Sequence, residues 1–392
     1  MHVCFYNQGL GDTGGVRVML DMAKMFHQNG NKVTIIISVV TKTAFEIPEY
    51  IDIYHLSKSN LRKLDLTRYQ RGNLEAKTRG KNGLRSLLSK VPMFVRVKKK
   101  LQYFFFLAVY KSILKRKLKY LNVDCFISLN MYSLLEITEL FSEISHTILH
   151  IHNDPQEVYC RKNYTATVSL QRIYQNENIK IVCISVEQKK ILAEFLKVEE
   201  SRMCVIYNSI DFGRIETLSN SDRVSEEGYI LGLGSLTIRK RFDRLILACI
   251  DANKSLKIIG DGPEKENLEL LVKNNNAEKL VTFSGFINNP YPYIRNASAL
   301  VLTSESEGLP TVLIEAIYLN TTVFSTACKT GPKELLLNES SQLISLEQSE
   351  KNLVSEIAAR LSNLPKSNTE EITESLGRFS FENVQKKWLS II

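Results

Sequence analysis

The residues best suited to chemistry lie in one stretch, from Ser304 to Ala316, in which seven residues separate two glutamates. An apolar run precedes this stretch, which predicts a strand, a loop and then a helix with Pro310 near its first position, where a missing N–H does no harm. Free amides at that helix start and the positive end of its dipole would attract an anion such as a diphosphate. Glu315, one turn into the helix, could accept both hydroxyls of a ribose, and Glu307 on the loop could hold sugar hydroxyls.

The first half of the chain is expected to form one sheet. An apolar run at 3–6 is followed by a glycine-rich stretch, an amphipathic helical pattern and a β-branched run at 33–37, which predicts a parallel β-α-β unit. Further buried strands are expected at 125–128, 147–151, 181–184 and 203–206. Together they predict a doubly wound sheet.

The second half repeats this alternation after the polar residues 211–228. We expect strands at 229–234, 256–259, 281–283, 299–302 and 322–325, with helices at about 242–252, 264–275 and 311–319. The predicted organisation is an N-terminal domain at 1–210, a linker at 211–228, a C-terminal domain at 229–377 and a terminal helical segment at 378–392 that packs back on the body. Two similar sheets imply a cleft at the carboxyl ends of their strands.

Positive charge is concentrated in one segment. Residues 58–119 hold 19 Lys and Arg against two acids, a net charge of +17, while the whole chain is +9. Apolar residues such as Tyr103–Leu107 are interleaved with these charges, as in segments that face an anionic membrane surface. A solvated helical face whose Phe residues belong to the core is the alternative. We expect no nucleic-acid partner, because no helix-turn-helix, zinc-finger or RNP-type pattern accompanies the charge.

The sequence lacks the motifs that several classes of enzyme require. The chain has no D-x-D pair to chelate a metal-bound diphosphate, and no G-x-S-x-G, H-E-x-x-H or Walker A lysine. Its seven cysteines include no C-x-x-C pair, which favours a reducing compartment without structural zinc. No basic and apolar leader and no window of about 18 apolar residues is found, so we expect a protein that is neither secreted nor integral to a membrane.

In the context of these elements, the sequence resembles the glycosyltransferase 4 family, retaining nucleotide-sugar transferases of the GT-B fold. Glu307-Gly308-Leu309-Pro310 through Glu315-Ala316 is similar to the family's E-x7-E element, and Gly14-Gly15 resembles the N-terminal glycine loop that approaches the donor phosphates. The resemblance extends over essentially the whole chain. It implies an α/β architecture of two Rossmann-like doubly wound domains facing a cleft.

Other motifs fall where family members carry theirs. Gly260-Asp261-Gly262-Pro263 resembles G-x-G-P, Phe283-Ser284-Gly285-Phe286 resembles the turn beside the base, and Asn208-Ser209-Ile210-Asp211 resembles P-N-G-[IV]-D. Asn289–Tyr293 and Gly331–Glu334 are similar to a branch that builds capsule, O-antigen and other surface polysaccharides.

The family's phosphate-binding element usually reads G-R-L-x-x-x-K-G. Here Lys240 matches the phosphate-binding lysine, whereas Ser235 replaces the arginine. Arg239 or Arg241 could substitute, since a guanidinium binds phosphate in a bidentate fashion. A solvated basic turn is the alternative interpretation of this segment.

Two histidines flank Ile151 after an expected strand, so His150 and His152 point the same way. The resemblance favours a histidine in this loop that contacts the donor sugar and the acceptor side, and His152 is our choice. A structural histidine is the alternative for either, and Asp154 could equally form a turn or cap.

The resemblance implies an enzyme that transfers a hexosyl or N-acetylhexosaminyl unit from a UDP sugar with retention and without a metal or other cofactor. Its partners would be the nucleotide sugar, a lipid-linked or glycan acceptor and the anionic inner face of the cell membrane, to which a cytoplasmic protein would attach peripherally. The pathway would be bacterial surface polysaccharide synthesis, such as lipopolysaccharide or capsule. The expected catalytic residues are Glu307, Lys240 and His152, and the expected donor-binding residues are Gly14, Gly15, Arg239, Gly262, Phe286, Gly308, Leu309, Pro310, Thr311, Val312 and Glu315.

The sequence is also compatible with two rival functions. One is a non-catalytic protein that binds a sugar nucleotide or a glycan, which the replacement at Ser235 makes possible. The other is a UDP-sugar epimerase or isomerase that uses the same twin-sheet cleft.

Overall fold

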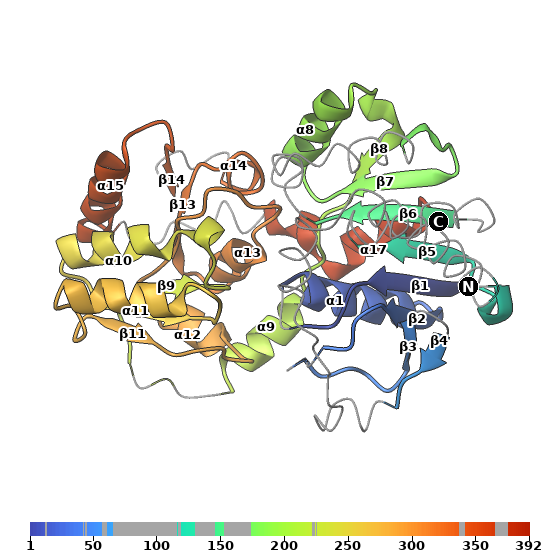
Figure 1. Cartoon of the computed structure of the whole chain (residues 1–392), viewed down its shortest axis with the longest axis horizontal. Coiled ribbons are helices and arrows are strands. Elements are labelled where there is room, and N and C mark those ends of the chain that lie inside the picture. The colour runs from blue at the N-terminus through green and yellow to red at the C-terminus, as the bar shows by residue number, and fades with distance from the viewer. Residues whose placement is uncertain are drawn as a thin grey trace, which may run out of the picture. The chain divides into compact units, whose positions relative to one another are not determined.

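A computed structural model gives the structure of the chain (Figure 1). It describes residues 1–11, 14–41, 43, 45–56, 61–65, 116, 119–129, 146–152, 174–221, 224, 226–336, 342–364 and 375–392. Nearly all of the basic segment 58–119 therefore lies outside the described residues, as do Asn153 and Asp154.

Within these ranges the strands form two sheets, with eight strands in the order β4-β3-β2-β1-β5-β6-β7-β8 and six in the order β11-β10-β9-β12-β13-β14. The first set is β1 His2–Asn7, β2 Lys32–Ile37, β3 Ile51–Leu56, β4 Leu61–Lys63, β5 Cys125–Ser128, β6 His146–Ile151, β7 Ile179–Cys183 and β8 Met203–Val205. The second set is β9 Ile230–Leu233, β10 Leu256–Ile259, β11 Val281–Phe283, β12 Ala299–Leu302, β13 Thr322–Thr326 and β14 Leu343–Ile344.

Helices connect these strands in the alternation that a parallel sheet requires. The α-helices are α1 Gly14–Gln28, α8 Val186–Leu196, α9 Phe212–Ser219, α10 Phe242–Asp251, α11 Lys265–Asn274, α12 Tyr291–Arg295, α13 Thr311–Tyr318, α14 Pro332–Leu335, α15 Glu350–Ser362 and α17 Phe381–Leu389. The short 3-10 turns are η2 Glu200–Arg202, η3 Ile238–Lys240 and η5 Leu376–Phe379.

The described residues divide into two compact units. The first contains residues up to Ile151, together with 174–182 and Ile392, and the second contains His152 and residues 183–391. In the first, β1 pairs in parallel with both β2 and β5, so that Phe5 lies opposite Ile35 and Ile127. The edge strand β4 joins β3 in antiparallel pairing.

Strand alternation gives the second unit a core on each face of its sheet. Leu231, Ile259, Leu300 and Val323 pack with residues of α9, α12 and α13. Their sequence neighbours Ile230, Ile258, Val301 and Phe324 pack with residues of α10, α11 and α15. The sheet is therefore buried on both sides, as its near-continuous apolar strands predict.

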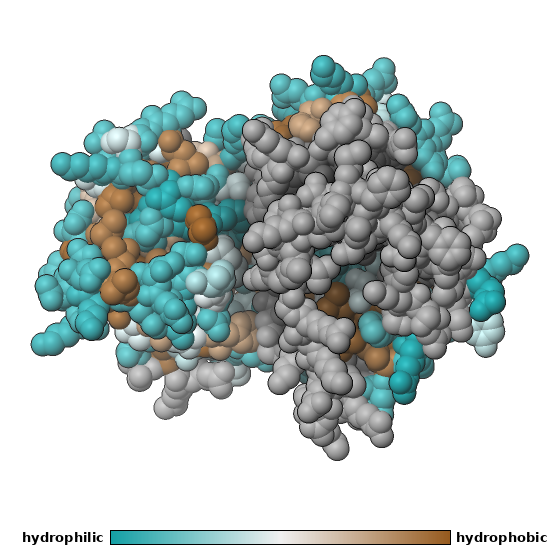
Figure 2. Space-filling view, viewed as in Figure 1, coloured by the Kyte–Doolittle hydropathy of each residue, from teal (hydrophilic) through white to brown (hydrophobic). Residues whose placement is uncertain are grey.

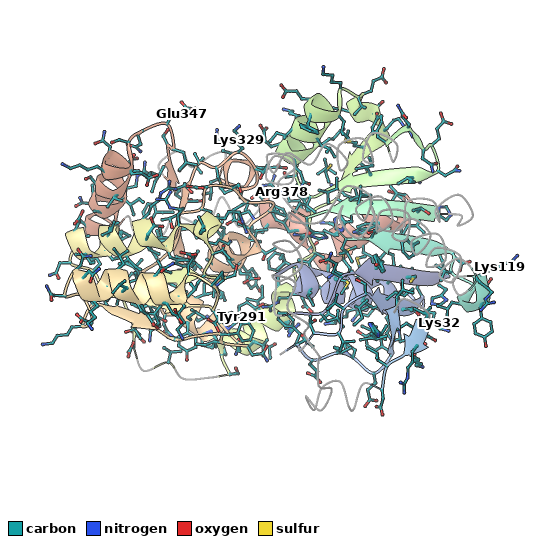
Figure 3. All side chains as sticks on the ribbon, in the orientation of Figure 1. Lys32, Lys119, Tyr291, Lys329, Glu347 and Arg378 are labelled. Atoms are coloured by element: carbon teal, nitrogen blue, oxygen red, sulfur yellow. The ribbon has the colours of Figure 1, made fainter. Side chains whose placement is uncertain are left out.

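Hydrophilic residues make up much of the face of this unit that Figure 2 shows. On the face seen in Figure 2, hydrophilic residues surround small hydrophobic patches over the elements from β9 to α15. The exposed side chains of Lys329, after β13, and Glu347, after β14, are labelled in Figure 3.

Most predicted elements are confirmed, with some differences. The strands expected at 125–128, 256–259, 281–283 and 299–302 have the predicted ends. The expected linker 211–228 contains α9, which begins where the Asp211 side chain accepts a hydrogen bond from the backbone N–H of Arg214 and which buries Ile215. The predicted domain limits stay a prediction. In the terminal segment, α17 buries Val384 and Trp388.

Candidate active site

The strand order of the second sheet marks one place where loops diverge. The chain passes from β9 to β10 and β11 on one side, and then to β12 and β13 on the other side of β9. In open parallel sheets ligands bind outside the carboxyl ends of the strands at such a reversal. The loops that follow β9 and β12, residues 234–241 and 303–310, both begin there.

A buried glutamate joins these two loops. The carboxylate of Glu307 accepts a hydrogen bond from Lys240 Nζ at 2.6 Å, from Arg239 Nη1 at 3.1 Å and from Ser304 Oγ at 2.5 Å. Its side chain is 7% exposed, against 13% for Lys240 and 31% for Arg239. We name Arg239, Lys240 and Glu307 the binding cluster. It combines two positive charges with one negative charge.

Opposing effects set the charge of Glu307. Burial raises the pKa of this carboxyl, but Lys240 and Arg239 outweigh burial and hold its pKa below the ordinary value. Glu307 is therefore ionised at neutral pH. Its hydrogen bonds from Lys240, Arg239 and Ser304 offset the cost of burying the charge.

The backbone of the Glu307 loop is anchored independently of the carboxylate. Thr330 Oγ1 donates to the carbonyl oxygen of Glu307, and the Arg239 guanidinium donates to that of Ser306. Thr326 Oγ1 donates to the carbonyl oxygen of Ser304 at 2.6 Å. Side chains that follow β13 or end it thus position a carboxylate that follows β12.

Close backbone approach requires glycine at two points beside this cluster. A Cβ on Gly308 would lie 2.4 Å from the carbonyl oxygen of His152, a residue of the same compact unit. A Cβ on Gly262 would lie 2.3 Å from the carbonyl oxygen of Leu236, so the loops after β9 and β10 touch through their backbones. Any larger residue at either point would push these loops apart.

The helix after Glu307 differs slightly from the sequence expectation. Pro310 is the N-cap of α13 rather than its first helical residue, and Thr311 begins the helix. Thr311 and Val312 are partly exposed, whereas Glu315 is 5% exposed on the second turn. Leu309 packs in the core, so its backbone and not its side chain remains available to a ligand.

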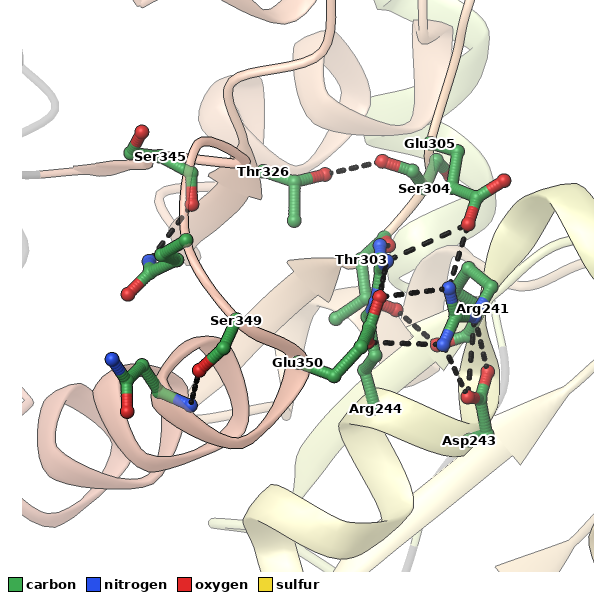
Figure 4. A network of polar contacts seen from close by, with 12 residues as sticks. Arg241, Asp243, Arg244, Thr303, Ser304, Glu305, Thr326, Ser345, Ser349 and Glu350 are labelled. Carbon is green, nitrogen blue, oxygen red and sulfur yellow. Dashed lines mark hydrogen bonds and ion pairs between the residues drawn. The ribbon is translucent and has the colours of Figure 1, made fainter.

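A second group of charges, drawn in Figure 4, has different partners. The Arg241 guanidinium bonds to Asp243, to Glu305 at 2.6 Å and to Glu350 at 3.0 Å, and Arg244 bonds to Glu350 at 2.5 Å. We name these five residues the arginine network. Hydrogen bonds to Asp243 above all raise the pKa of Arg241, and the bond from Arg244 lowers the pKa of Glu350 to about 2.

The other predicted site residues lie at several places. His152 is half-buried at the end of β6, and burial lowers its pKa to about 4, so its imidazole is neutral at neutral pH. Phe286 is 42% exposed in the turn after β11. Gly14 and Gly15 open α1 in the first unit, and a Cβ on either would meet nothing within 4 Å.

The structure thus brings Lys240, Arg239 and Glu307 together within one unit, and it leaves Arg241 with other partners. Sequence reasoning missed Ser304 and Thr330 as residues that hold Glu307. Ser304 was inside the stretch singled out, three residues before Glu307, and its hydroxyl is the signal that could have found it. Thr330 carries no such signal because it follows a different strand.

Among the described residues, no group of three or more His, Cys, Asp or Glu side chains is arranged to hold a metal ion. No described helix is both long enough and apolar enough to cross a membrane.

A family model matches the part of the chain that contains these loops. Residues 214–374 match the family described as Glycosyl transferases group 1. The matched region contains the whole binding cluster and Glu315.

Curated relatives are similar over part of their length. An uncharacterized glycosyltransferase of Methanocaldococcus jannaschii is 30% identical over 205 residues, which cover 49% of this chain and 50% of the relative. The N-acetylgalactosamine-N,N'-diacetylbacillosaminyl-diphospho-undecaprenol 4-alpha-N-acetylgalactosaminyltransferase of Campylobacter jejuni is 27% identical over 228 residues, 56% of this chain and 62% of the relative. The chain therefore spans between half and two thirds of the length of these two relatives.

A solved structure is similar over the full chain. A mutant of S. aureus TarM, solved in complex with Fondaparinux, alpha-GlcNAc-glycerol and UDP, has a TM-score of 0.71 and 12% identity, and the match covers 100% of this chain and 99% of the TarM chain. The predicted GT-B fold, an α/β architecture with two Rossmann-like domains, is confirmed.

Proposed function

We propose, on the premise that the chain carries a glycosyl transferases group 1 domain in a GT-B fold, that it is a glycosyltransferase of surface polysaccharide synthesis. It would transfer a hexosyl or N-acetylhexosaminyl unit from a UDP sugar, with retention, to a lipid-linked or polysaccharide acceptor. The binding cluster carries this proposal. In this cluster two cations and a buried carboxylate meet on the loops after β9 and β12, where the strand order of the parallel sheet reverses.

The cations of the cluster suit a diphosphate. Lys240 supplies a point charge and Arg239 a planar guanidinium that can bond two phosphate oxygens. Arg239 lies beside Lys240 on the same carboxylate, which supports it as the substitute for the arginine missing at Ser235. Arg241 is a weaker candidate because three carboxylates already surround it.

The two glutamates would bind different parts of the donor. Glu315 on α13 would accept the ribose hydroxyls, and Glu307 would accept hydroxyls of the transferred sugar. The backbone amides at the start of α13 would add to the diphosphate site. His152, neutral at neutral pH, would bond to the sugar without adding charge.

Charge on the leaving diphosphate would be met by fixed groups of the protein. Lys240, Arg239 and the backbone amides would stabilise it in the transition state. The acceptor would attack from the face that the diphosphate leaves, with assistance from a leaving phosphate oxygen and without a covalent enzyme intermediate. Because the sequence lacks D-x-D, we expect activity to survive excess EDTA within about twofold.

Named relatives support the choice of substrates. The TarM structure was solved with UDP, and the name of the Campylobacter jejuni relative specifies a diphospho-undecaprenol acceptor. A lipid-linked acceptor would also give a role to the basic segment 58–119, which has a net charge of +17 and would hold the protein at an anionic membrane surface. Co-sedimentation with anionic and neutral vesicles tests that attachment.

The test of the proposed function is UDP release. Purified protein is incubated with a panel of UDP sugars and lipid-linked acceptors, and both UDP and the glycosylated acceptor are measured. Transfer with UDP release supports the proposal. Binding of the nucleotide sugar without turnover would favour a non-catalytic protein, and conversion of the sugar without UDP release would favour an epimerase.

A further inference from the structure

The two cations assigned to the donor diphosphate contact the same carboxylate in the structure. We propose that Glu307 is an internal competitor of the donor. It neutralises Lys240 and Arg239 until a diphosphate takes its place, and the exchange releases its carboxylate to the sugar hydroxyls. This inference rests on the proposed donor site and goes beyond it, because it makes diphosphate binding and sugar binding steps of one exchange.

The number of acceptor positions on Glu307 supports the exchange. A carboxylate has about four lone-pair positions. One oxygen accepts from Lys240 and Ser304, and the other accepts from Arg239. One position is then left for a sugar hydroxyl, and release of both cations would make three available.

Charge also favours the exchange. A pyrophosphate diester carries more negative charge than one carboxylate, and it can bond to Lys240 and Arg239 together. Glu307 is 7% exposed, so water screens it little, and a diphosphate at the same cations would meet its repulsion. The carboxylate therefore lowers donor affinity as long as it keeps its charge and its position.

The backbone anchors allow the side chain to leave without moving the loop. Thr330 holds the carbonyl oxygen of Glu307, and Thr326 holds that of Ser304 at 2.6 Å. Neither bond involves the carboxylate. The anchors from Thr330 and Thr326 can therefore stay in place while the Glu307 side chain changes its rotamer.

Affinity for UDP and for inorganic pyrophosphate, measured by calorimetry on the full chain, tests this inference. Glu307→Gln keeps the size of the side chain and removes its charge, and it should bind both probes about tenfold more tightly, equal to about 1.4 kcal/mol, while its turnover falls. Glu305→Gln is the matched control, because Glu305 bonds to Arg241 and lies on the same loop. The affinity of Glu305→Gln for UDP and pyrophosphate should stay within about twofold of the wild-type value.

A second pair of variants separates charge from shape and covers the case in which Glu307→Gln fails to fold. Glu307→Asn should bind UDP more tightly than Glu307→Asp, which has the same shape and keeps the charge. Thermal unfolding of each variant confirms that it is folded. Neutral variants that bind UDP and pyrophosphate no more tightly than the wild type overturn the inference.

Failure of the inference is distinguishable from failure of the proposed function. A wild-type protein that releases UDP during transfer, with neutral variants of unchanged affinity, overturns only the competition. A wild-type protein that binds neither pyrophosphate nor any nucleoside diphosphate overturns both.

Discussion

The binding cluster and the arginine network are neighbours with opposite balances of charge. Arg239 and Lys240 share one carboxylate, whereas Arg241 and Arg244 share three. In the binding cluster the carboxylate is buried, at 7% exposure, but Glu305 and Glu350 of the network are 49% and 59% exposed. One cluster keeps a surplus of positive charge and the other has none.

This difference suggests how adjacent residues divide their work. An anionic ligand gains most from cations whose charge is incompletely neutralised, so the binding cluster suits a diphosphate. The network suits a positioning role, because Arg244 donates to the carbonyl oxygen of Thr303, whose hydroxyl donates to those of Lys240 and Arg241. The network thus holds the backbone that presents Lys240.

The largest expected effect comes from removing the central cation. Lys240→Ala should lower turnover by about 10²- to 10³-fold, because one preorganised group no longer meets the leaving-group charge. Arg241→Ala is the matched control, and its turnover per folded molecule should remain within a fewfold of the wild type. UDP release measures both, and an active Lys240→Ala would remove the functional distinction between the two clusters.

The second prediction concerns stability. Arg244→Met should lower the free energy of unfolding by about 1.5–3 kcal/mol, the range for hydrogen bonds to charged groups. Affinity of the folded variant for UDP should change little, because the Thr303 hydroxyl still donates to the carbonyl oxygen of Lys240. Urea unfolding gives the stability and calorimetry the affinity. Unchanged stability combined with lost UDP binding would place Arg244 in the binding site instead.

The third prediction compares two arginines two residues apart. Arg239→Gln should weaken UDP binding about tenfold, the value of about one charge-assisted hydrogen bond. Arg241→Gln should leave UDP binding within about twofold, since its partners are carboxylates of the network. Calorimetry on both variants decides, and the reverse ranking would move the phosphate contact to Arg241.

The smallest effect should appear in acid. The pKa of Glu350 falls from 4.5 to about 2, so its contribution to stability is present above pH 4.5 and is lost as the pH falls towards 2. Because this side chain is 59% exposed, the contribution should be only about 0.2–1 kcal/mol. The stability difference between wild type and Glu350→Gln should therefore shrink in that window. A difference that stays constant from pH 6 to pH 2 would show that the ion pair contributes nothing.

Sequence patterns predicted several apolar strands to the residue, but they did not predict strand β3, strand β14 or the helix α15. The run at 299–302 is apolar throughout and was predicted to the residue. Strand β14 has two residues, Leu343 and Ile344, too few to show a period. Helix α9 was expected to be part of a linker because the stretch 211–228 as a whole is polar, although Asp211 at its N-cap was a usable signal.

The sequence by itself determined the parallel α/β architecture and the identity of the residues with suitable chemistry. Apolar periodicity and loop glycines are local properties, and they specify strands, helices and the ends where a site can form. Only the tertiary structure decided which basic residue joins which acid. Lys240 and Glu307 are 67 residues apart, and Arg244 and Glu350 are 106 residues apart. Such pairs form because β12 lies beside β9 and because α15 packs on α10. Neither arrangement can be predicted from the local sequence.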